Sequence, residues 1–418
     1  GQIETFQAEM GTSAGKAEAM AEDGVRAEEP LHIVQLCTSS TFNGEAAHVY
    51  SLARSLQARG HAVTLAYRRR KAGRLLELHP RLIEQYGIRS SLPLDLDKGL
   101  SPLTNPRGLF QLAAFVERHP VQIVHAHRGL DHSAAGILSR LLGVWRSRPV
   151  HLVRTRHVTT PIRGHRANRW LYERADLLLA TAKCIQEEFC RKFPGLRTPV
   201  HLFHGGVDVE RFSPDHAPAD LRAQRGIAPE AIIVGCVGHL DPVKGYDGAI
   251  AALAKLSREG ADLHLVIAGA AGAWSPETLQ ALAAEQGVGS RVHLLGFRRD
   301  IPELLAAFDI GLIPSVGSEG NSRTALEMMA GGLPVVAGAV GCLPDLIEPG
   351  ANGFLASAGD VEALCRCIRR LAQEADLRRK MGRAGRHRAE TLYDERQVAA
   401  RLETLYRGLL QGRGGPRE

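Results

Sequence analysis

The sequence predicts an α/β protein built from two doubly wound domains that face each other across a cleft. Two successive series of short apolar runs alternate with amphipathic segments, and a polar stretch with several prolines separates the two series. The chain has 418 residues, 44% of them hydrophobic, which is enough for more than one core. Doubly wound domains bind ligands at the carboxyl ends of their strands, so the cleft is the expected active site.

The first series of apolar runs suits the buried strands of a parallel sheet. Between its first two runs, apolar residues recur at helical spacing, and Gly60 lies where such a helix would end. The beginning of this series is therefore a β-α-β unit. The predicted strands cover residues 31–36, 63–66, 122–124, 151–153 and 177–179.

The second series has the same pattern, with predicted strands at residues 232–237, 263–268, 292–294, 310–313 and 335–337. After Asp360 the pattern is helical to about Leu410, and we expect this last segment to pack back across the first domain. The expected organisation is a disordered tail (1–30), a first domain (31–210), a linker (211–230), a second domain (231–392) and a C-terminal helix (393–418).

Composition restricts the function only loosely. A net charge of +7 and a pI of about 9.2 permit a nucleotide, an anionic membrane surface or a nucleic acid as partner. Basic residues cluster at 68–74 and 154–169, but aromatic residues are only 5% of the chain and no nucleic-acid module is evident, which argues against nucleic-acid binding.

Cysteine usage and hydropathy indicate a cytoplasmic protein. The seven cysteines lie far apart, and the one close pair, Cys365 and Cys367, falls in a helical pattern, so we expect reduced thiols. The first 30 residues lack the apolar core of a signal peptide, and no later run has the length of a membrane-spanning helix. We therefore expect a soluble or peripherally bound protein.

A glycine-rich turn before a helix carries the strongest functional signal. Residues 315–337 read SVGSEGNSRTALEMMAGGLPVVA, in which a predicted strand ends and a helix runs from Thr324 to Ala330. A helix N-terminus favours anionic or hydroxyl-rich ligands, and Gly320 permits close backbone approach. The carboxylates of Glu319 and Glu327 can accept bonds from vicinal hydroxyls. Alternatively, Glu319 caps the helix and Glu327 is a solvated helix residue.

Two further segments point to phosphate and sugar. Residues 238–245, GHLDPVKG, follow a strand, so Lys244 would place an ammonium over a diphosphate, unless it is simply a surface lysine in a turn. His239 in the same segment is a weaker candidate, because a neutral imidazole stabilises phosphate poorly. Gly44, in the loop 38–45, could bring backbone amides close to a phosphate or an acceptor. This loop lacks the G-x-G-x-x-G pattern of a dinucleotide-binding dehydrogenase.

Two histidines end the predicted strand at 121–127, VQIVHAH, and lie on one face because they alternate. His127, at the carboxyl end, would point into the cleft and hydrogen-bond a substrate. His125 remains open to a plainer interpretation as a hydrogen-bonded core histidine. Metal binding ranks lower, because no third or fourth ligand is evident nearby.

Together these segments resemble the retaining glycosyltransferases of family 4, which have the GT-B fold of two Rossmann-like domains. The resemblance begins near Leu31 and is carried by the two glutamates eight residues apart and by residues 204–214, 238–245, 294–315 and 331–355. It implies these roles: Glu319 on the transferred sugar, Glu327 on the ribose, the amides of Gly320, Asn321 and Ser322 on the sugar and diphosphate, Lys244 and His239 at the diphosphate, His127 beside the reacting sugar, Gly44 near the phosphates, and Phe297 and Arg298 near the nucleobase.

The resemblance also implies a reaction. A UDP-, GDP- or ADP-sugar would give up its sugar with retention of configuration, without metal or another cofactor, because Lys244 and the helix dipole supply positive charge. The basic first domain would bind a glycan, lipid-linked or lipopolysaccharide-core acceptor, at the inner face of the plasma membrane, with Arg156 and Arg163 flanking a loop suited to acceptor phosphate. His239 stands where the family usually has arginine, and Asn321 where it has an aromatic residue. The alternative is therefore a partner subunit that binds nucleotide sugars without transferring them.

Overall fold

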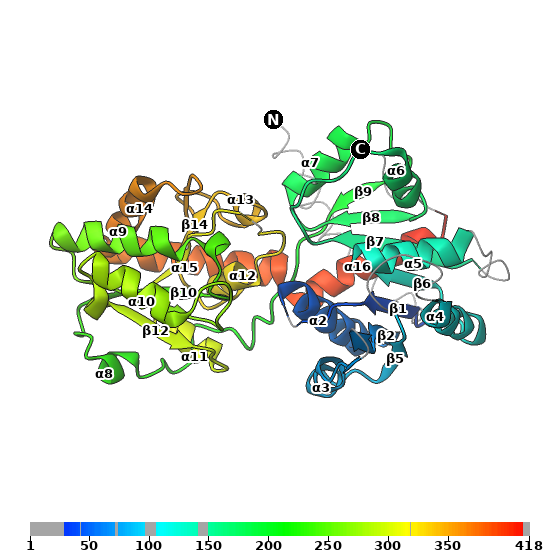
Figure 1. Cartoon of the computed structure of the whole chain (residues 1–418), viewed down its shortest axis with the longest axis horizontal. Coiled ribbons are helices and arrows are strands. Elements are labelled where there is room, and N and C mark those ends of the chain that lie inside the picture. Colours follow the sequence, from blue (N-terminus) through cyan, green and yellow to red (C-terminus); the bar gives the residue numbers. More distant parts are fainter. Residues whose placement is uncertain are drawn as a thin grey trace, which may run out of the picture.

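The structure, a computed structural model, describes residues 29–41, 43–71, 74–96, 106–140, 149–317 and 319–412. Two α/β domains lie side by side along the long axis of the molecule (Figure 1). Each has a parallel sheet with helices on both faces, of seven strands in the first domain and six in the second. The predicted fold class is confirmed. The disordered tail predicted for residues 1–30 falls almost entirely on residues outside this description.

The first sheet has the strand order β5-β2-β1-β6-β7-β8-β9. Its first five predicted strands are present, and β5 and β9 were not predicted because they are short and poor in β-branched residues. The strands are β1 (His32–Cys37), β2 (Ala62–Arg68), β5 (Ser90–Leu94), β6 (Ile123–Ala126), β7 (His151–Arg156), β8 (Leu177–Ala180) and β9 (Val200–Leu202). A small hairpin, β3 (Arg70–Lys71) and β4 (Arg74–Leu75), follows β2. The helices are α2 (Gly44–Ala58), α3 (Leu78–Gln85), α4 (Pro106–Arg118), α5 (Gly129–Arg140), α6 (Arg166–Tyr172) and α7 (Lys183–Lys192).

The second sheet has the order β12-β11-β10-β13-β14-β15. Its strands are β10 (Ile232–Val237), β11 (Leu263–Ala268), β12 (Val292–Gly296), β13 (Ile310–Ile313), β14 (Val335–Gly338) and β15 (Gly353–Ala356), of which β15 was not predicted. The helical segments are α8 (Leu221–Arg225), η2 (Pro242–Lys244), α9 (Tyr246–Arg258), α10 (Pro276–Glu285), η3 (Gly289–Arg291), α11 (Ile301–Ala306), α12 (Arg323–Ala330), α13 (Leu343–Leu346), α14 (Val361–Gln373) and α15 (Ala375–Arg388).

The chain then returns to the first domain, as predicted. A π-helical segment, η4 (Ala389–Tyr393), leads into α16 (Glu395–Leu410), which lies among the elements of the first domain in Figure 1. Its apolar face, with Leu402 and Tyr406, is buried in the same core cluster as residues of α2 and β1. The chain passes between the domains twice, and the two passing segments lie against each other: the Val207 amide donates a hydrogen bond to the Tyr393 carbonyl at 2.8 Å.

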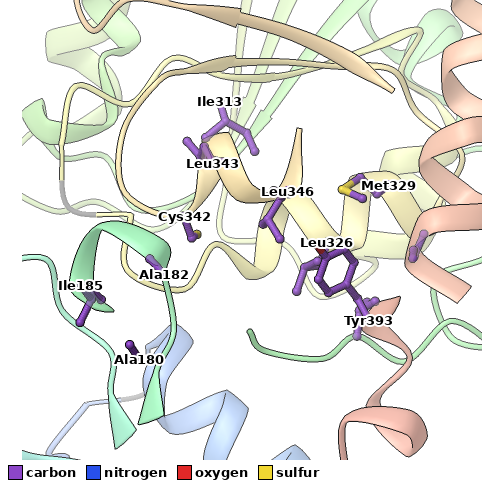
Figure 2. Close-up of a cluster of buried hydrophobic side chains, with 14 of the residues drawn as sticks. Ala180, Ala182, Ile185, Ile313, Leu326, Met329, Cys342, Leu343, Leu346 and Tyr393 are labelled. Carbon is purple, nitrogen blue, oxygen red and sulfur yellow. The ribbon is translucent and has the colours of Figure 1, made fainter. Parts of the chain in front are cut away.

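Apolar side chains also join the two domains at their seam. Ala180, Ala182 and Ile185 of the first domain belong to one buried cluster with side chains of the second domain (Figure 2). On the second domain this cluster includes residues that follow β14, such as Cys342 and Leu346. The seam is therefore packed at the edge where strands of both sheets end.

Candidate active site

The carboxylate of Glu319 lies in the turn between β13 and α12 and is only 4% exposed as a residue. Its Oε1 accepts a hydrogen bond from Lys244 Nζ at 2.6 Å and another from Ser315 Oγ at 2.7 Å. Glu319 does not cap α12: the N-cap residue is Ser322, which makes no side-chain capping bond. The capping interpretation of Glu319 is wrong, and Lys244 is not a simple surface lysine.

These side chains line a pocket at a topologically special point of the second sheet. The chain runs outward from β10 to β11 on one side and from β13 to β14 on the other, so β10 and β13 flank the point where strand order reverses. Crevices at such points are the usual ligand sites of open α/β sheets. The pocket is small and opens to solvent, and its polar lining includes Lys244, Ser315, Glu319, Ser322 and Thr324.

Glu327 is not solvated, which is also contrary to the plainer interpretation. Its side chain is 12% exposed and pairs with Arg323 one helical turn earlier, with Nη2 at 3.2 Å from Oε1. Burial is the largest single effect on the pKa of Arg323 and lowers it, but Glu327 and Tyr86 together outweigh burial and keep this pKa above its usual value. Sequence reasoning missed Arg323, although its spacing of four from Glu327 is a recognisable signal.

The glycine-rich turn presses against the first domain. A Cβ on Gly320 would lie 1.9 Å from the backbone carbonyl oxygen of His157, so only glycine fits this approach. Thr181 of the first domain donates a hydrogen bond to the Gly320 carbonyl. Three backbone amides were predicted to bind the sugar nucleotide, and one of them, the amide of Ser322, donates a hydrogen bond to Cys342 Sγ at 3.2 Å. The Asn321 Nδ2 is buried without a hydrogen-bond partner among the described residues.

Of the other residues predicted to bind the sugar nucleotide, Gly44 lies against the glycine-rich turn, whereas His239, Phe297 and Arg298 do not line the pocket. Gly44 is the first residue of α2, and a Cβ there would lie 3.6 Å from the Asn321 carbonyl oxygen, so the structure brings Gly44 to the site. His239 is exposed just after β10. Phe297, 67% exposed, and Arg298, which donates to Asp300 at 2.8 Å, follow β12 at the same sheet edge but outside the lining of the pocket.

His127 does not point into an open cleft, so that expectation is wrong in this structure. The residue is 1% exposed, and both of its ring nitrogens have protein partners. Its Nε2 lies 2.6 Å from Gln35 Oε1, and its Nδ1 lies 3.1 Å from His157 Nε2. His125 is a core histidine bonded to Tyr406 and Thr155, which confirms the plainer interpretation of that residue.

His157 is a site residue that sequence reasoning missed. It directly follows β7, is 5% exposed, and its Nδ1 has no hydrogen-bond partner among the described residues. Its backbone carbonyl lies against Gly320, so the residue is in direct contact with the glycine-rich turn. His48 of α2 packs edge-on against it, with ring centroids 5.4 Å apart. The signal was available, because His157 ends its strand just as His127 does, but the predicted strand stopped at residue 153.

The basic clusters of the first domain are only partly on the surface. Arg68, Arg154 and Arg156, which belong to the basic clusters at residues 68–74 and 154–169, are only 4%, 5% and 8% exposed. Burial lowers the pKa of Arg154 to about 10, and nearby Asp131 opposes that shift. Arg156 donates to the Thr160 carbonyl within its own loop, and its burial keeps it off the surface where an acceptor phosphate was expected.

Neither a metal-binding cluster nor a membrane-spanning helix is found among the described residues. No group of three or more histidine, cysteine, aspartate or glutamate residues in the described ranges is arranged to hold a metal ion. Within those same ranges, no helix has both the length and the apolar character needed to cross a membrane.

The fold and the site define a protein of the GT-B class. HepE of Anabaena, solved in complex with UDP and glucose, superposes with a TM-score of 0.74 over 90% of this chain and 99% of its own, at 23% identity. The profile of "Glycosyl transferases group 1" matches residues 219–388, and that of "Glycosyltransferase Family 4" matches residues 42–211. The chain therefore belongs to glycosyltransferase family 4.

Sequence relatives agree with this membership. The Bacillus subtilis protein named "Putative glycosyltransferase EpsD" is 32% identical over 301 residues, or 69% of this chain and 77% of that protein. A GDP-mannose-dependent phosphatidylinositol monomannoside mannosyltransferase of Mycolicibacterium smegmatis is 34% identical over 251 residues, or 57% of this chain and 64% of that protein. Several curated relatives are matched over only about half of their own length, such as 48% and 53%.

Proposed function

We propose that this protein transfers a sugar from a nucleoside-diphosphate sugar to a hydroxyl group of an acceptor, with retention of anomeric configuration. The observation that carries the proposal is the buried Glu319 carboxylate, held at 2.6 Å by the Lys244 ammonium at the switch point of the second sheet. A buried ion pair of this kind is not explained by stability alone, because apolar residues would usually stabilise a fold equally well. A ligand that carries both hydroxyls and phosphates supplies that reason.

The two charges of the pair suit two parts of such a donor. Lys244 is 29% exposed at its side chain and can reach a diphosphate in the pocket mouth, where it offsets the charge that grows on the leaving group. Glu319 remains as an acceptor for sugar hydroxyls. Glu327 lies eight positions further along the chain, is paired with Arg323, and accepts the ribose hydroxyls. The N-terminus of α12 adds positive potential, so the proposal requires no divalent metal.

We assign the place beside the reacting sugar to His157 and not to His127. The Nδ1 of His157 is buried, lacks a partner among the described residues and belongs to a residue that touches Gly320. His127 is hydrogen-bonded to the other ring nitrogen of His157, Nε2. A neutral imidazole nitrogen at that position can exchange a hydrogen bond with a sugar or acceptor hydroxyl as the bond to the diphosphate breaks.

We propose a lipid-linked acceptor, presented at an anionic membrane surface. The M. smegmatis relative is named for a phosphatidylinositol monomannoside substrate, which is a lipid. On this chain the exposed β3–β4 hairpin combines Lys71 and Arg74 with Leu75, which is 60% exposed, and α4 exposes Phe110 at 71%. Each basic residue near an anionic surface adds about 1 kcal/mol of attraction, and the apolar side chains can enter the interface.

Donor-dependent transfer tests the proposal. UDP-, GDP- and ADP-sugars are incubated with the protein and a glycolipid acceptor, with and without EDTA, and products are identified by mass spectrometry and by NMR of the new anomeric centre. We expect one donor to be used, with retention and without loss in EDTA, and Glu319→Gln to lower kcat by at least about 100-fold. Binding of a nucleotide sugar, seen as a higher Tm, with no transfer to any acceptor would instead support a non-transferring partner subunit. Full activity in Glu319→Gln would overturn the assignment.

A further inference from the structure

A continuous chain of buried hydrogen bonds connects the C-terminal helix to the histidine at the domain seam. Tyr406 of α16 is fully buried, and its hydroxyl lies 3.2 Å from Gln35 Nε2 on β1. Gln35 Oε1 lies 2.6 Å from His127 Nε2, and His127 Nδ1 lies 3.1 Å from His157 Nε2. The chain of hydrogen bonds ends at Nδ1 of His157, which is buried without a partner among the described residues, and the backbone carbonyl of the same residue lies against Gly320.

The direction of the hydrogen bonds in this chain determines what His157 presents. Burial lowers the pKa of both His127 and His157 well below its usual value, so each ring is neutral and carries a single N–H. Gln35 Oε1 can only accept, so His127 Nε2 carries the hydrogen and His127 Nδ1 is bare. His157 must then donate through Nε2, which leaves Nδ1 of His157 as a bare acceptor. Reversing the Gln35 amide would reverse every bond and turn that nitrogen into a donor.

Tyr406 links the Gln35 amide to a second branch. Its hydroxyl also lies 2.6 Å from His125 Nδ1, and His125 Nε2 lies 2.6 Å from Thr155 Oγ1. When the hydroxyl accepts from Gln35 it must donate to His125, and His125 then donates to Thr155. The Gln35 amide therefore cannot rotate by 180° unless the Tyr406–His125 and His125–Thr155 hydrogen bonds also reverse direction. Hydrogen bonds coupled in this way favour one common direction.

We infer that Tyr406 is a positioning residue, which fixes through the intervening side chains the ring nitrogen that His157 presents at the seam. The inference rests on the proposed function, in which that nitrogen accepts a hydrogen bond from a substrate hydroxyl. It assigns a role in the site to α16, the helix that returns from the second domain. Tyr406 itself touches no substrate and acts only by keeping His157 in one tautomer.

The test removes the Tyr406 hydroxyl and nothing else. In Tyr406→Phe the Gln35 amide can adopt either orientation, so we expect His157 to change from one tautomer to a mixture. Histidine ¹⁵N shifts in long-range ¹H–¹⁵N spectra report this, with the His157 signals assigned by loss in His157→Gln. Because only the tautomer with bare Nδ1 is active, kcat should fall in proportion to its population, about twofold to tenfold, with the donor Kd unchanged. Gln35→Met breaks the same chain and should give a similar mixture.

Tyr50→Phe is the matched control. Tyr50 is also fully buried in the first domain, and its hydroxyl bonds a histidine, His79 Nδ1, at 2.8 Å, but this pair is not part of the chain. We expect a similar fall in Tm for both tyrosine variants, with the His157 tautomer shifted only in Tyr406→Phe.

Two outcomes would overturn the inference. One is a single unchanged His157 tautomer in Tyr406→Phe. The other is a mixture of tautomers already present in the wild-type protein. The spectra do not depend on activity, so a shifted tautomer in a protein that transfers no sugar would refute the proposed function and leave the hydrogen-bonded chain established.

Discussion

Replacement of Lys244 by alanine tests the central ion pair. The Lys244 ammonium lies 2.6 Å from a Glu319 carboxylate whose side chain is only 5% exposed. Removing one partner of a fully buried pair costs about 3–5 kcal/mol. Here the lysine is 29% exposed, and Ser315 still donates to the carboxylate, so we expect a loss of about 1–2 kcal/mol in the free energy of unfolding.

The expected effect of Lys244→Ala on transfer is larger than its effect on stability. A hydrogen bond from a charged donor to a phosphate contributes about 1.5–3 kcal/mol, which corresponds to roughly 10- to 150-fold in kcat/KM. If the lysine stabilises the departing diphosphate, most of this loss falls on kcat. Initial rates at several donor concentrations separate the two parameters, and thermal melting measures stability in the same samples.

Lys255→Ala is the matched control, because Lys255 also pairs with a glutamate of the second domain, Glu362, but lies on the surface away from the pocket. We expect wild-type rates and an unchanged Tm. The reasoning fails if Lys244→Ala keeps kcat/KM within twofold of wild type, or if Lys255→Ala loses as much activity.

Three further predictions concern the turn, the helix and pH. Gly320→Ala places a Cβ against a first-domain carbonyl and should lower kcat at least about tenfold, whereas Gly248→Ala, which has room for a Cβ, should not; equal rates would contradict the seam geometry. Glu327→Gln should raise the donor KM about tenfold with a smaller change in kcat, measured by initial rates; an unaltered KM would exclude a ribose contact. Burial lowers the pKa of His48 to about 4, so below pH 6.5 the unfolded chain takes up a proton that the folded protein does not. His48 alone should therefore lower stability by up to about 1.4 kcal/mol per pH unit between pH 6.5 and 4, and His127 and His157, whose pKa values burial also lowers, should add to this fall. A Tm that is the same at pH 7.5 and 5 would refute this.

Much of the second domain was predictable, because its strands are uninterrupted apolar runs and its functional residues directly follow them. Residues 232–237, 263–268 and 310–313 form strands with the predicted bounds. The sequence identified Lys244 and Glu319 separately. It could not show that they form an ion pair, because that depends on β10 and β13 being neighbours in the sheet.

The first domain was harder to predict, because the accessibility of its polar residues is decided by contacts distant in sequence. His127 and His157 both follow parallel strands, and only the positions of Gln35 and of the C-terminal helix decide that His127 lies behind His157. Likewise, the sequence suggests a surface position for Arg154, but its side chain is buried near Asp131.

The return of α16 has a consequence for biosynthesis. Val398, Leu402 and Tyr406 fill the core of a domain whose other strands and helices come from the first half of the chain. A chain emerging from the ribosome can form the sheet of this domain early, but an apolar groove over α2 stays open until the last helix has been made. Truncated or stalled products therefore expose that groove and lack Tyr406, which makes them both prone to aggregation and poor in activity. The core of the first domain is therefore closed only after α16 has been synthesised.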